Sequence, residues 1–212
     1  VVLMGWASCS HSGTGHAALP DPRAVDKSVP EYKNPFHPST YAHFVARKDY
    51  RKTYDVYKDD TLLNRQPKKS RKIFVCLDEQ RGQYLVDGLV AMDFPLSSGV
   101  KAYPTKTGDY AVISKKEDHT SNLYGKMYDA EGKCINYNAE STDPIPEGGR
   151  FDGSPMPYWQ RLTNAGLGLH VGKVRRHPVS HGCVRLPRNV AEILYRQTSI
   201  GTPVTIQKTP LP

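Results

Sequence analysis

The sequence is poor in long apolar runs, in cysteine and in phenylalanine, and each shortage narrows the class of protein. After its first few residues it has no run of about 20 apolar residues, so no later segment is expected to cross a membrane as a helix. Only 4 cysteines in 212 residues exclude a fold held by many disulfides. Phe occurs 5 times and Tyr 13 times, which favours half-exposed strands and polar clefts over a large apolar interior.

The sequence also lacks an internal repeat and a phosphate-binding glycine loop. The segment Gly166–Gly172 is rich in glycine, but its spacing is not that of a nucleotide-binding loop. These absences leave a turn-rich protein with 17 Gly and 17 Pro, for which one catalytic domain with an N-terminal extension is the simplest organisation.

Positive charge is in excess, with 29 Lys and Arg against 21 Asp and Glu. The basic residues are scattered, and the densest run, Lys68-Lys69-Ser70-Arg71-Lys72, has no aromatic residues within it. Nucleic-acid binding usually needs basic residues clustered on one face, so no nucleic acid is expected as a partner and the run is interpreted as a solvated linker edge. The net charge of +8 instead favours attraction to anionic polymers of the cell envelope.

The first nine residues, Val1–Cys9, are apolar and resemble the end of a secretory signal. Ala7-Ser8-Cys9 resembles the end of a bacterial lipoprotein signal, although Trp6 is unusual there. On this hypothesis Cys9 carries a lipid that anchors the mature chain to a membrane. An ordinary signal peptide or an ordinary apolar N-terminus is the open alternative. Either signal would place the protein outside the cytoplasm, in the periplasm or cell envelope.

The remaining chain is predicted to consist of an extension at residues 10–70, a domain at residues 71–207 and a tail at residues 208–212. Residues 10 to about 40 are rich in Ser, Gly, Pro and His and show no sustained apolar period, so no regular structure is assigned to them. The segment Tyr41–Tyr57 is aromatic and is expected to pack on the domain that follows.

Short strands are predicted from residue 71 onward. Asp87-Gly88 is a hairpin turn that needs positive φ, and it separates strands at Gln83–Val86 and Leu89–Met92. The segment Asp143–Pro157 is rich in Pro and Gly and is predicted to be a long surface loop. Further strands are expected at Ile73–Leu77, Asp109–Ser114, Gly166–Val171 and Thr202–Gln207.

One helix is predicted after Arg185. Pro187 suits its first position, Val190, Ile193 and Leu194 give it an apolar face, and Gly201 is placed to end it. The fold class is therefore mainly β, with one or two short helices and an irregular N-terminal extension.

The segment Ser180-His181-Gly182-Cys183-Val184-Arg185-Leu186-Pro187 carries the most specific chemistry. A thiol attacks as thiolate, and cationic or hydrogen-bonding neighbours lower its pKa from about 8.5. This segment supplies several such neighbours, so a lowered pKa is expected for Cys183. Gly182 leaves the backbone N–H groups beside the sulfur free to face an oxyanion. Of the remaining cysteines, Cys76 and Cys134 are expected to be unpaired.

Three histidines precede Cys183 as candidate bases. His170 ends a predicted strand, a rigid position from which its ring could face the thiol, whereas His181 lies only two residues away and is expected to present mainly its backbone. A zinc site made by His170, His177, His181 and Cys183 is an alternative. It is disfavoured because the spacing has no paired C-x-x-C and one loop would have to enclose the ion.

Gly168-Leu169-His170 together with Ser180–Arg185 resembles the signature of the L,D-transpeptidase catalytic domain, the YkuD family. Leu96–Gly99, Pro104–Tyr110 and Met156-Pro157-Tyr158 resemble further motifs of that family, in the same order. The resemblance covers roughly Arg71 to Gln207. Departures are Ser98, where the family often has Thr, Lys106 in the second motif, and a separation of 13 residues between His170 and Cys183, short for the family.

The resemblance implies a β-sandwich-like fold and cysteine acyl transfer on peptidoglycan stem peptides. Cys183 would attack the carbonyl between a diamino acid and the terminal D-Ala, and His170 would take the thiol proton. Ser180, His181 and Gly182 would form the loop and the oxyanion site. By the same resemblance Arg185 would bind a substrate carboxylate, with a structural salt bridge as the alternative, and Tyr158 would line the pocket or belong to the core. No metal or organic cofactor is needed.

The acceptor remains open at this stage. A neighbouring stem amine would give a 3-3 cross-link, water would give carboxypeptidase activity, and a protein amine would attach an envelope protein to peptidoglycan. A non-catalytic lipoprotein that binds the cell wall is the alternative from another class. The partners expected are peptidoglycan stem peptides and, through Cys9, a membrane, with the protein itself a monomer.

Overall fold

The computed structural model describes residues 19–66 and 70–210, and the chain divides into two compact units, Val1–Tyr50 and Arg51–Pro212. The predicted signal segment with Cys9 and the basic residues Lys68 and Lys69 lie outside the described residues. Among the described residues, no helix is long and apolar enough to cross a membrane.

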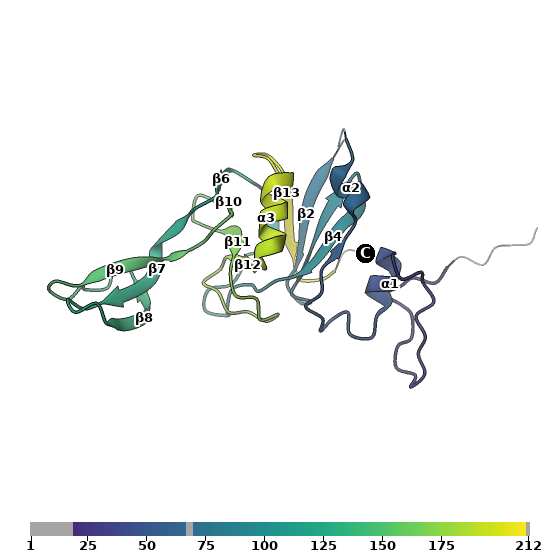
Figure 1. The fold of residues 1–212 in the computed structure, drawn as a ribbon, viewed down its shortest axis with the longest axis horizontal. Coiled ribbons are helices and arrows are strands. Elements are labelled where there is room, and N and C mark those ends of the chain that lie inside the picture. Colours follow the sequence, from purple (N-terminus) through teal and green to yellow (C-terminus); the bar gives the residue numbers. More distant parts are fainter. Residues whose placement is uncertain (1–18, 67–69, 211–212) are drawn as a thin grey trace, which may run out of the picture. The chain divides into compact units, whose positions relative to one another are not determined.

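The first unit contains one short helix, α1 (Tyr41–Ala46) (Figure 1). Thr40 caps it by accepting a hydrogen bond from the His43 N–H. The Lys27 ammonium donates to the Val45 carbonyl at 2.6 Å, so a side chain from the preceding irregular segment satisfies the end of the helix. Phe44 packs edge to face on Tyr50, with ring centroids 5.7 Å apart.

The second unit contains a six-stranded sheet in the order β1-β4-β3-β2-β13-β5. Asp87 and Gly88 have φ of 51° and 79°, which confirms the predicted hairpin turn. The short helix α2 (Asp60–Asn64) begins at Asp59, whose carboxylate accepts from the Leu62 N–H, and buries Leu62 and Leu63 in the core. Residues 51–66 are thus part of the same compact unit as the β-rich domain. The strands are β1 (Tyr57–Lys58), β2 (Arg71–Cys76), β3 (Arg81–Val86), β4 (Leu89–Pro95), β5 (Gly108–Ala111) and β13 (Pro203–Gln207).

A four-stranded sheet in the order β12-β11-β10-β6 shares this core. Its strands are β6 (Ser114–Lys116), β10 (Trp159–Arg161), β11 (Gly168–Val171) and β12 (Val184–Leu186), and only β11 and β12 run parallel. Leu169, Val184 and Leu186 pack in one apolar cluster with buried residues of α3 (Arg188–Gln197). Figure 1 shows α3 between β11 and β12 on one side and the six-stranded sheet on the other.

The segment predicted as a single strand at Asp109–Ser114 is two strands, because the chain changes sheets in its middle. The Val112 N–H donates to the carbonyl of Thr202, the residue just before β13. The Ile113 N–H donates to the Arg161 carbonyl of β10. This crossing leads the chain from β5 of the large sheet into β6 of the smaller one.

The third sheet contains β7 (Thr120–Tyr128), β8 (Cys134–Glu140) and β9 (Arg150–Pro155), in the order β8-β7-β9. Figure 1 shows it extending from the ends of β6 and β10. The predicted long loop at Asp143–Pro157 is wrong, because β9 occupies much of it. Gly148 lies in a turn with a φ of 70°, whereas Gly153 allows close approach of strands: a Cβ on Gly153 would lie 1.9 Å from the Ser121 carbonyl oxygen. In β7, a Cβ on Gly125 would likewise lie 2.2 Å from the Asp152 carbonyl oxygen.

The helix α3 differs from its prediction at both ends. Pro187 is the N-cap and lies just before the first helical residue. The helix stops at Gln197, before Gly201, because Thr198 caps it: its hydroxyl contacts the Leu194 carbonyl at 2.7 Å and the Gln160 side-chain oxygen at 2.6 Å. The Lys115 ammonium adds bonds to two carbonyls at the same end.

Cys76 and Cys134 are both free, as expected from the sequence.

Candidate active site

The pairing of β11 with β12 determines which side chains share a face. Leu169 pairs with Val184 and His170 with Arg185. Continued by one residue, this register sets Gly168 opposite Cys183. Because side chains alternate along a strand, His170, Cys183 and Arg185 lie on one face, and the apolar residues between them face the core. The candidate base and nucleophile therefore occupy neighbouring strands on the same side.

His170 is held as a neutral base. Its ring Nδ1 lies 2.7 Å from the Val171 carbonyl oxygen, a bond that only a protonated Nδ1 can donate, so Nε2 keeps its lone pair. The side chain is only 6% exposed, and burial lowers its pKa to about 4. The positive charges of Arg185 and His119 add to this lowering. At neutral pH the imidazole is uncharged and able to accept a proton.

The lowered pKa expected for the Cys183 thiol is wrong in the free protein. Burial raises this pKa, while the Gly168 N–H and the charge on Arg185 act in the opposite direction with smaller effect. The sulfur donates a weak hydrogen bond to the Gly166 carbonyl at 3.4 Å, which fits a protonated thiol. At neutral pH the thiol of the free protein is therefore protonated.

Ser180 and Gly182 shape the loop around the nucleophile. The Ser180 hydroxyl donates to the Cys183 carbonyl at 2.5 Å and accepts from the Gly182 N–H at 3.2 Å. Gly182 has a φ of +109°, in the region that favours glycine. The short bond fixes the backbone of Cys183, and the longer one leaves the Gly182 N–H only weakly engaged.

The segments Leu96–Gly99 and Pro104–Tyr110, which resemble family motifs, contact the loop before Cys183. The Thr105 hydroxyl donates to the Gly182 carbonyl at 2.6 Å and accepts from the Gly99 N–H at 2.8 Å. Gly99 also forms a bridge with Ser180. A Cβ on Gly99 would lie 2.8 Å from the Gly182 Cα, so this approach requires glycine. These motifs thus position the Cys183 loop.

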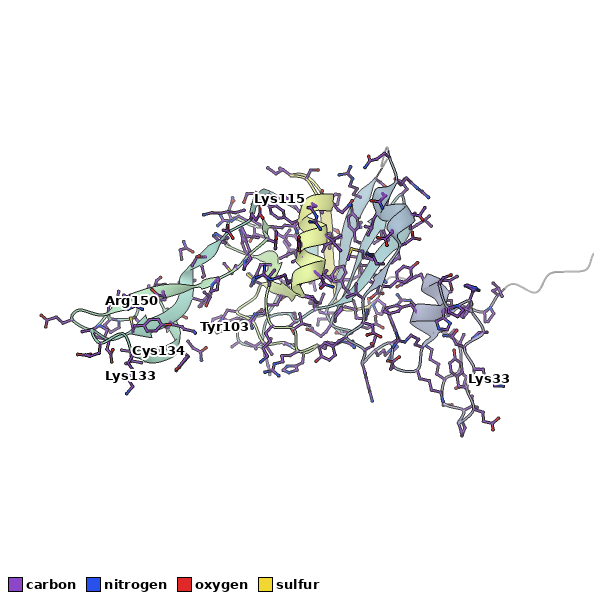
Figure 2. All side chains as sticks on the ribbon, viewed as in Figure 1. Lys33, Tyr103, Lys115, Lys133, Cys134 and Arg150 are labelled. Atoms are coloured by element: carbon purple, nitrogen blue, oxygen red, sulfur yellow. The ribbon has the colours of Figure 1, made fainter. Side chains whose placement is uncertain are left out.

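His181 lies on the surface of the loop, in a small aromatic cluster. Its ring stacks on Tyr124 of β7, with centroids 4.4 Å apart, and contacts Tyr103 at 4.8 Å. Figure 2 labels Tyr103 near the point where the three-stranded sheet joins the rest of the unit. His177 is exposed. Within residues 19–66 and 70–210 no group of three His, Cys, Asp or Glu side chains has a metal-binding arrangement, so the four residues considered as zinc ligands are not gathered at one point.

Arg185 and Tyr158, the two expected substrate contacts, are placed differently. Arg185 lines the cavity beside Cys183, and no carboxylate in the described part of the chain forms a salt bridge with it. Tyr158 does not line the cavity: it has a φ of 56° and its ring packs edge to face on Tyr195 of α3. Of the two alternatives that the sequence left open for Tyr158, the structure favours the core residue, because its backbone turns the ring toward the helix.

Cys183 and His170 open into a cavity of about 790 Å³. Trp159 and His119 also line it, with ring centroids 5.0 Å apart, and Trp159 lies 5.9 Å from His170. Sequence reasoning missed both residues. Trp159 directly follows the predicted aromatic motif, which was a usable signal, whereas His119 stands alone in the sequence. A further wall comes from the three-stranded sheet, including Tyr124.

Arg176 anchors the loop between β11 and Cys183. It has a φ of 56°, and its guanidinium donates to the Thr53 carbonyl at 2.8 Å and to the Glu79 carbonyl at 2.9 Å. Next to it, the Arg175 N–H donates to the Ser97 hydroxyl and the Arg175 carbonyl accepts from the Tyr54 hydroxyl. Thr53 and Tyr54, from the segment before β1, thus fix the start of the loop that carries the nucleophile.

We expect Arg176→Ala to lower the free energy of unfolding by about 3 kcal/mol, because it removes two charge-assisted hydrogen bonds, to the Thr53 and Glu79 carbonyls. Acylation of Cys183 should slow at least tenfold, since the loop loses its anchor. Denaturant unfolding and the rate of adduct formation with a carbapenem measure the two effects. Arg175→Ala is the matched control, since its described hydrogen bonds come from the main chain. Equal behaviour of the two variants would refute the anchoring role.

The comparisons with known proteins agree with this geometry. A family model described as YkuD, the L,D-transpeptidase catalytic domain, matches residues 70–206. Probable L,D-transpeptidase 3 of Mycobacterium tuberculosis is 31% identical over 121 residues, which are 54% of this chain and 38% of that protein. The chain therefore spans about two fifths of the length of this curated relative.

Two solved structures share the fold. An L,D-transpeptidase from Mycobacterium smegmatis has a TM-score of 0.50 and 22% identity, covering 65% of this chain and 58% of the other. The L,D-transpeptidase LdtMt1 in complex with imipenem has a TM-score of 0.50 and 21% identity, covering 65% of this chain and 59% of the other.

Proposed function

The chain belongs to the YkuD family of L,D-transpeptidase catalytic domains, and from this premise we propose that it is a peptidoglycan L,D-transpeptidase working through an acyl-enzyme on Cys183. One observation carries the proposal. A half-buried thiol and a buried, neutral imidazole share one face of the β11–β12 pair, and both line the same cavity. Such a pair can carry out acyl transfer without a cofactor.

In the first half-reaction the Cys183 sulfur attacks the carbonyl between the diamino acid and the terminal D-Ala of a tetrapeptide stem. The thiol proton passes to Nε2 of His170 as the carbon–sulfur bond forms. The carbon–nitrogen bond then breaks, the leaving amine takes the proton from His170, and D-Ala departs. Because burial disfavours the charged form of His170 and lowers its pKa to about 4, the protonated imidazole returns its proton readily to the leaving amine.

The negative oxygen of the tetrahedral intermediate needs donors near Gly182 and Cys183. We assign the Gly182 N–H as one of them, because its bond to the Ser180 hydroxyl is long enough, at 3.2 Å, to be exchanged. The Ser180 bond to the Cys183 carbonyl would keep the loop in place during that exchange.

In the second half-reaction an amine of a neighbouring stem attacks the thioester, loses its proton to His170 and releases Cys183 with a 3-3 cross-link formed. Water in place of the amine would give a tripeptide, and a protein amine would attach an envelope protein. Because peptidoglycan lies outside the cytoplasm, the protein is proposed to act in the periplasm or cell envelope, as a monomer. The lipid on Cys9 remains a proposal from the sequence.

The test is incubation of the full chain with a purified tetrapeptide muropeptide, followed by mass spectrometry. We expect a cross-linked dimer together with free D-Ala. A tripeptide alone would assign carboxypeptidase activity to the same site. Unchanged muropeptide, with no carbapenem adduct on the protein and with retained binding to isolated sacculi, would overturn the proposal in favour of a cell-wall-binding protein.

A further inference from the structure

The cavity is lined by basic side chains without acidic ones. Lys106, Arg161, Lys173 and Arg185 contribute to its wall, and no Asp or Glu does so among the residues that the structure describes. None of the four forms a salt bridge with a carboxylate in that part of the chain. Uncompensated positive charge in a concave site attracts anions, so the ligand of this cavity should carry negative charge.

The sheet register places Arg161 relative to the nucleophile. Arg161 of β10 pairs with Gly168 of β11, and Gly168 in turn lies opposite Cys183. Alternation along the strands puts the Arg161 side chain on the face of His170 and Cys183. Because neighbouring strands are about 4.8 Å apart, the backbones of Arg161 and Cys183 are about 10 Å apart. Arg185 lies in β12, two residues after the nucleophile, so the two arginines belong to different strands that share this face.

Gly168, which lies between Arg161 and Cys183 across the sheet, has no room for a side chain. A Cβ on Gly168 would lie 2.5 Å from the ring of Trp159 and 2.6 Å from the Gln160 carbonyl oxygen. The missing side chain lets the indole of Trp159 lie over Gly168, where it also lines the cavity. A ligand chain that runs from Cys183 toward Arg161 would therefore pass an aromatic surface before it meets the guanidinium.

We propose that Arg161 binds a second carboxylate of the donor stem, on the acyl side of the scissile bond, while Arg185 serves the carboxylate of the leaving D-Ala. This inference rests on the proposed function. The acyl side of a stem offers two carboxyl groups of the same chemistry, one at the far end of the diamino acid side chain and one on the isoglutamyl residue. Either fits the bidentate geometry of a guanidinium. The enzyme should therefore prefer stems in which this carboxyl group is free over stems in which it is amidated.

The test compares three tetrapeptide stems on the full chain: one with both groups free, one amidated at the diamino acid and one amidated at the isoglutamyl residue. For the wild type, kcat/KM should fall at least tenfold on one or both amidated stems, and the stem that loses activity identifies the carboxylate. Equal turnover of all three stems overturns the inference. This comparison needs no variant.

The variant Arg161→Gln completes a thermodynamic cycle in which one change is made in the protein and the other in the substrate. Its kcat/KM should be at least about tenfold below that of the wild type on the free stem. On the amidated stem that the wild type disfavours, its kcat/KM should be close to that of the wild type, because amidation and the substitution remove the same interaction. Arg161→Lys should recover part of the activity on the free stem. Arg188→Gln, which removes one exposed charge outside the cavity, is the control for general electrostatics. A loss with Arg161→Gln that is equal on all three stems overturns carboxylate recognition.

Failure of the proposed function has a different signature. If wild-type protein processes none of the three stems, the assignment of stem peptides as substrate fails, whereas turnover without discrimination refutes only the role of Arg161.

Discussion

Replacing Cys183 by alanine should abolish acyl-enzyme formation completely. No other described thiol lines the cavity, and without a sulfur opposite Gly168 nothing there can form the covalent intermediate. Intact-mass spectrometry after incubation with a carbapenem measures the loss, because wild-type protein should gain the mass of one adduct and Cys183→Ala should gain none. Turnover of a tetrapeptide stem should vanish in parallel.

Cys134→Ala is the matched control for this experiment. Cys134 is a free thiol at the start of β8, does not line the cavity and is labelled in Figure 2 in the three-stranded sheet. Its removal should leave the adduct and the turnover unchanged. An adduct that persists on Cys183→Ala but disappears with Cys134→Ala would contradict the assignment of the nucleophile.

Replacing His170 by alanine should slow acylation by about 100-fold to 10,000-fold, the usual contribution of a general base. The raised pKa of the Cys183 thiol makes this loss large, since very little thiolate exists at neutral pH without the base. Stopped-flow or quenched acylation with a carbapenem measures the rate. Unfolding of the variant by denaturant checks that the fold persists.

The pH dependence separates loss of a base from a general structural defect. In the wild type the rate should stay near its maximum on acidification to about pH 5, and fall only as His170 becomes protonated near its pKa of about 4. An unperturbed histidine would lose activity near pH 6.5 instead. In His170→Ala the residual rate should rise about tenfold for each pH unit, because it now follows the thiolate fraction, until the raised pKa of the thiol is passed. A variant with a slow, pH-independent rate would contradict the role of base.

Local sequence patterns predicted those parts of the fold that local geometry determines. The Asp87-Gly88 turn is an example, because positive φ at both positions is a property of the dipeptide itself. The roles proposed for Cys183 and His170 came from the combination of a strand, a glycine loop and the family resemblance. Here the structure adds the register, which brings the two residues to one face.

Features that depend on contacts between distant segments could not be predicted from the sequence. The glycines of Asp143–Pro157 looked like turn residues, whereas Gly153 is needed because β7 passes within contact distance of its backbone. Tyr158 looked like a pocket residue, but its positive φ points the ring at α3 and leaves Trp159 at the cavity. The thiol pKa is the sharpest case. Its charged neighbours are visible in the sequence, while the burial that outweighs them arises only when distant segments close over Cys183.

The parallel pairing of β11 with β12 also makes the alignment of the candidate catalytic residues independent of the length of the segment that connects the two strands. Cys183 is aligned with Gly168 by strand pairing, by the bridge between Ser180 and Gly99 and by Thr105. Of the connecting segment, the parts held in place are thus the anchor at Arg176 and the end at Ser180. The separation of 13 residues between His170 and Cys183, short for the family, therefore need not alter the chemistry. The exposed stretch around His177 and Pro178 is accordingly the place where the chain can gain or lose length during evolution while the reacting atoms keep their places.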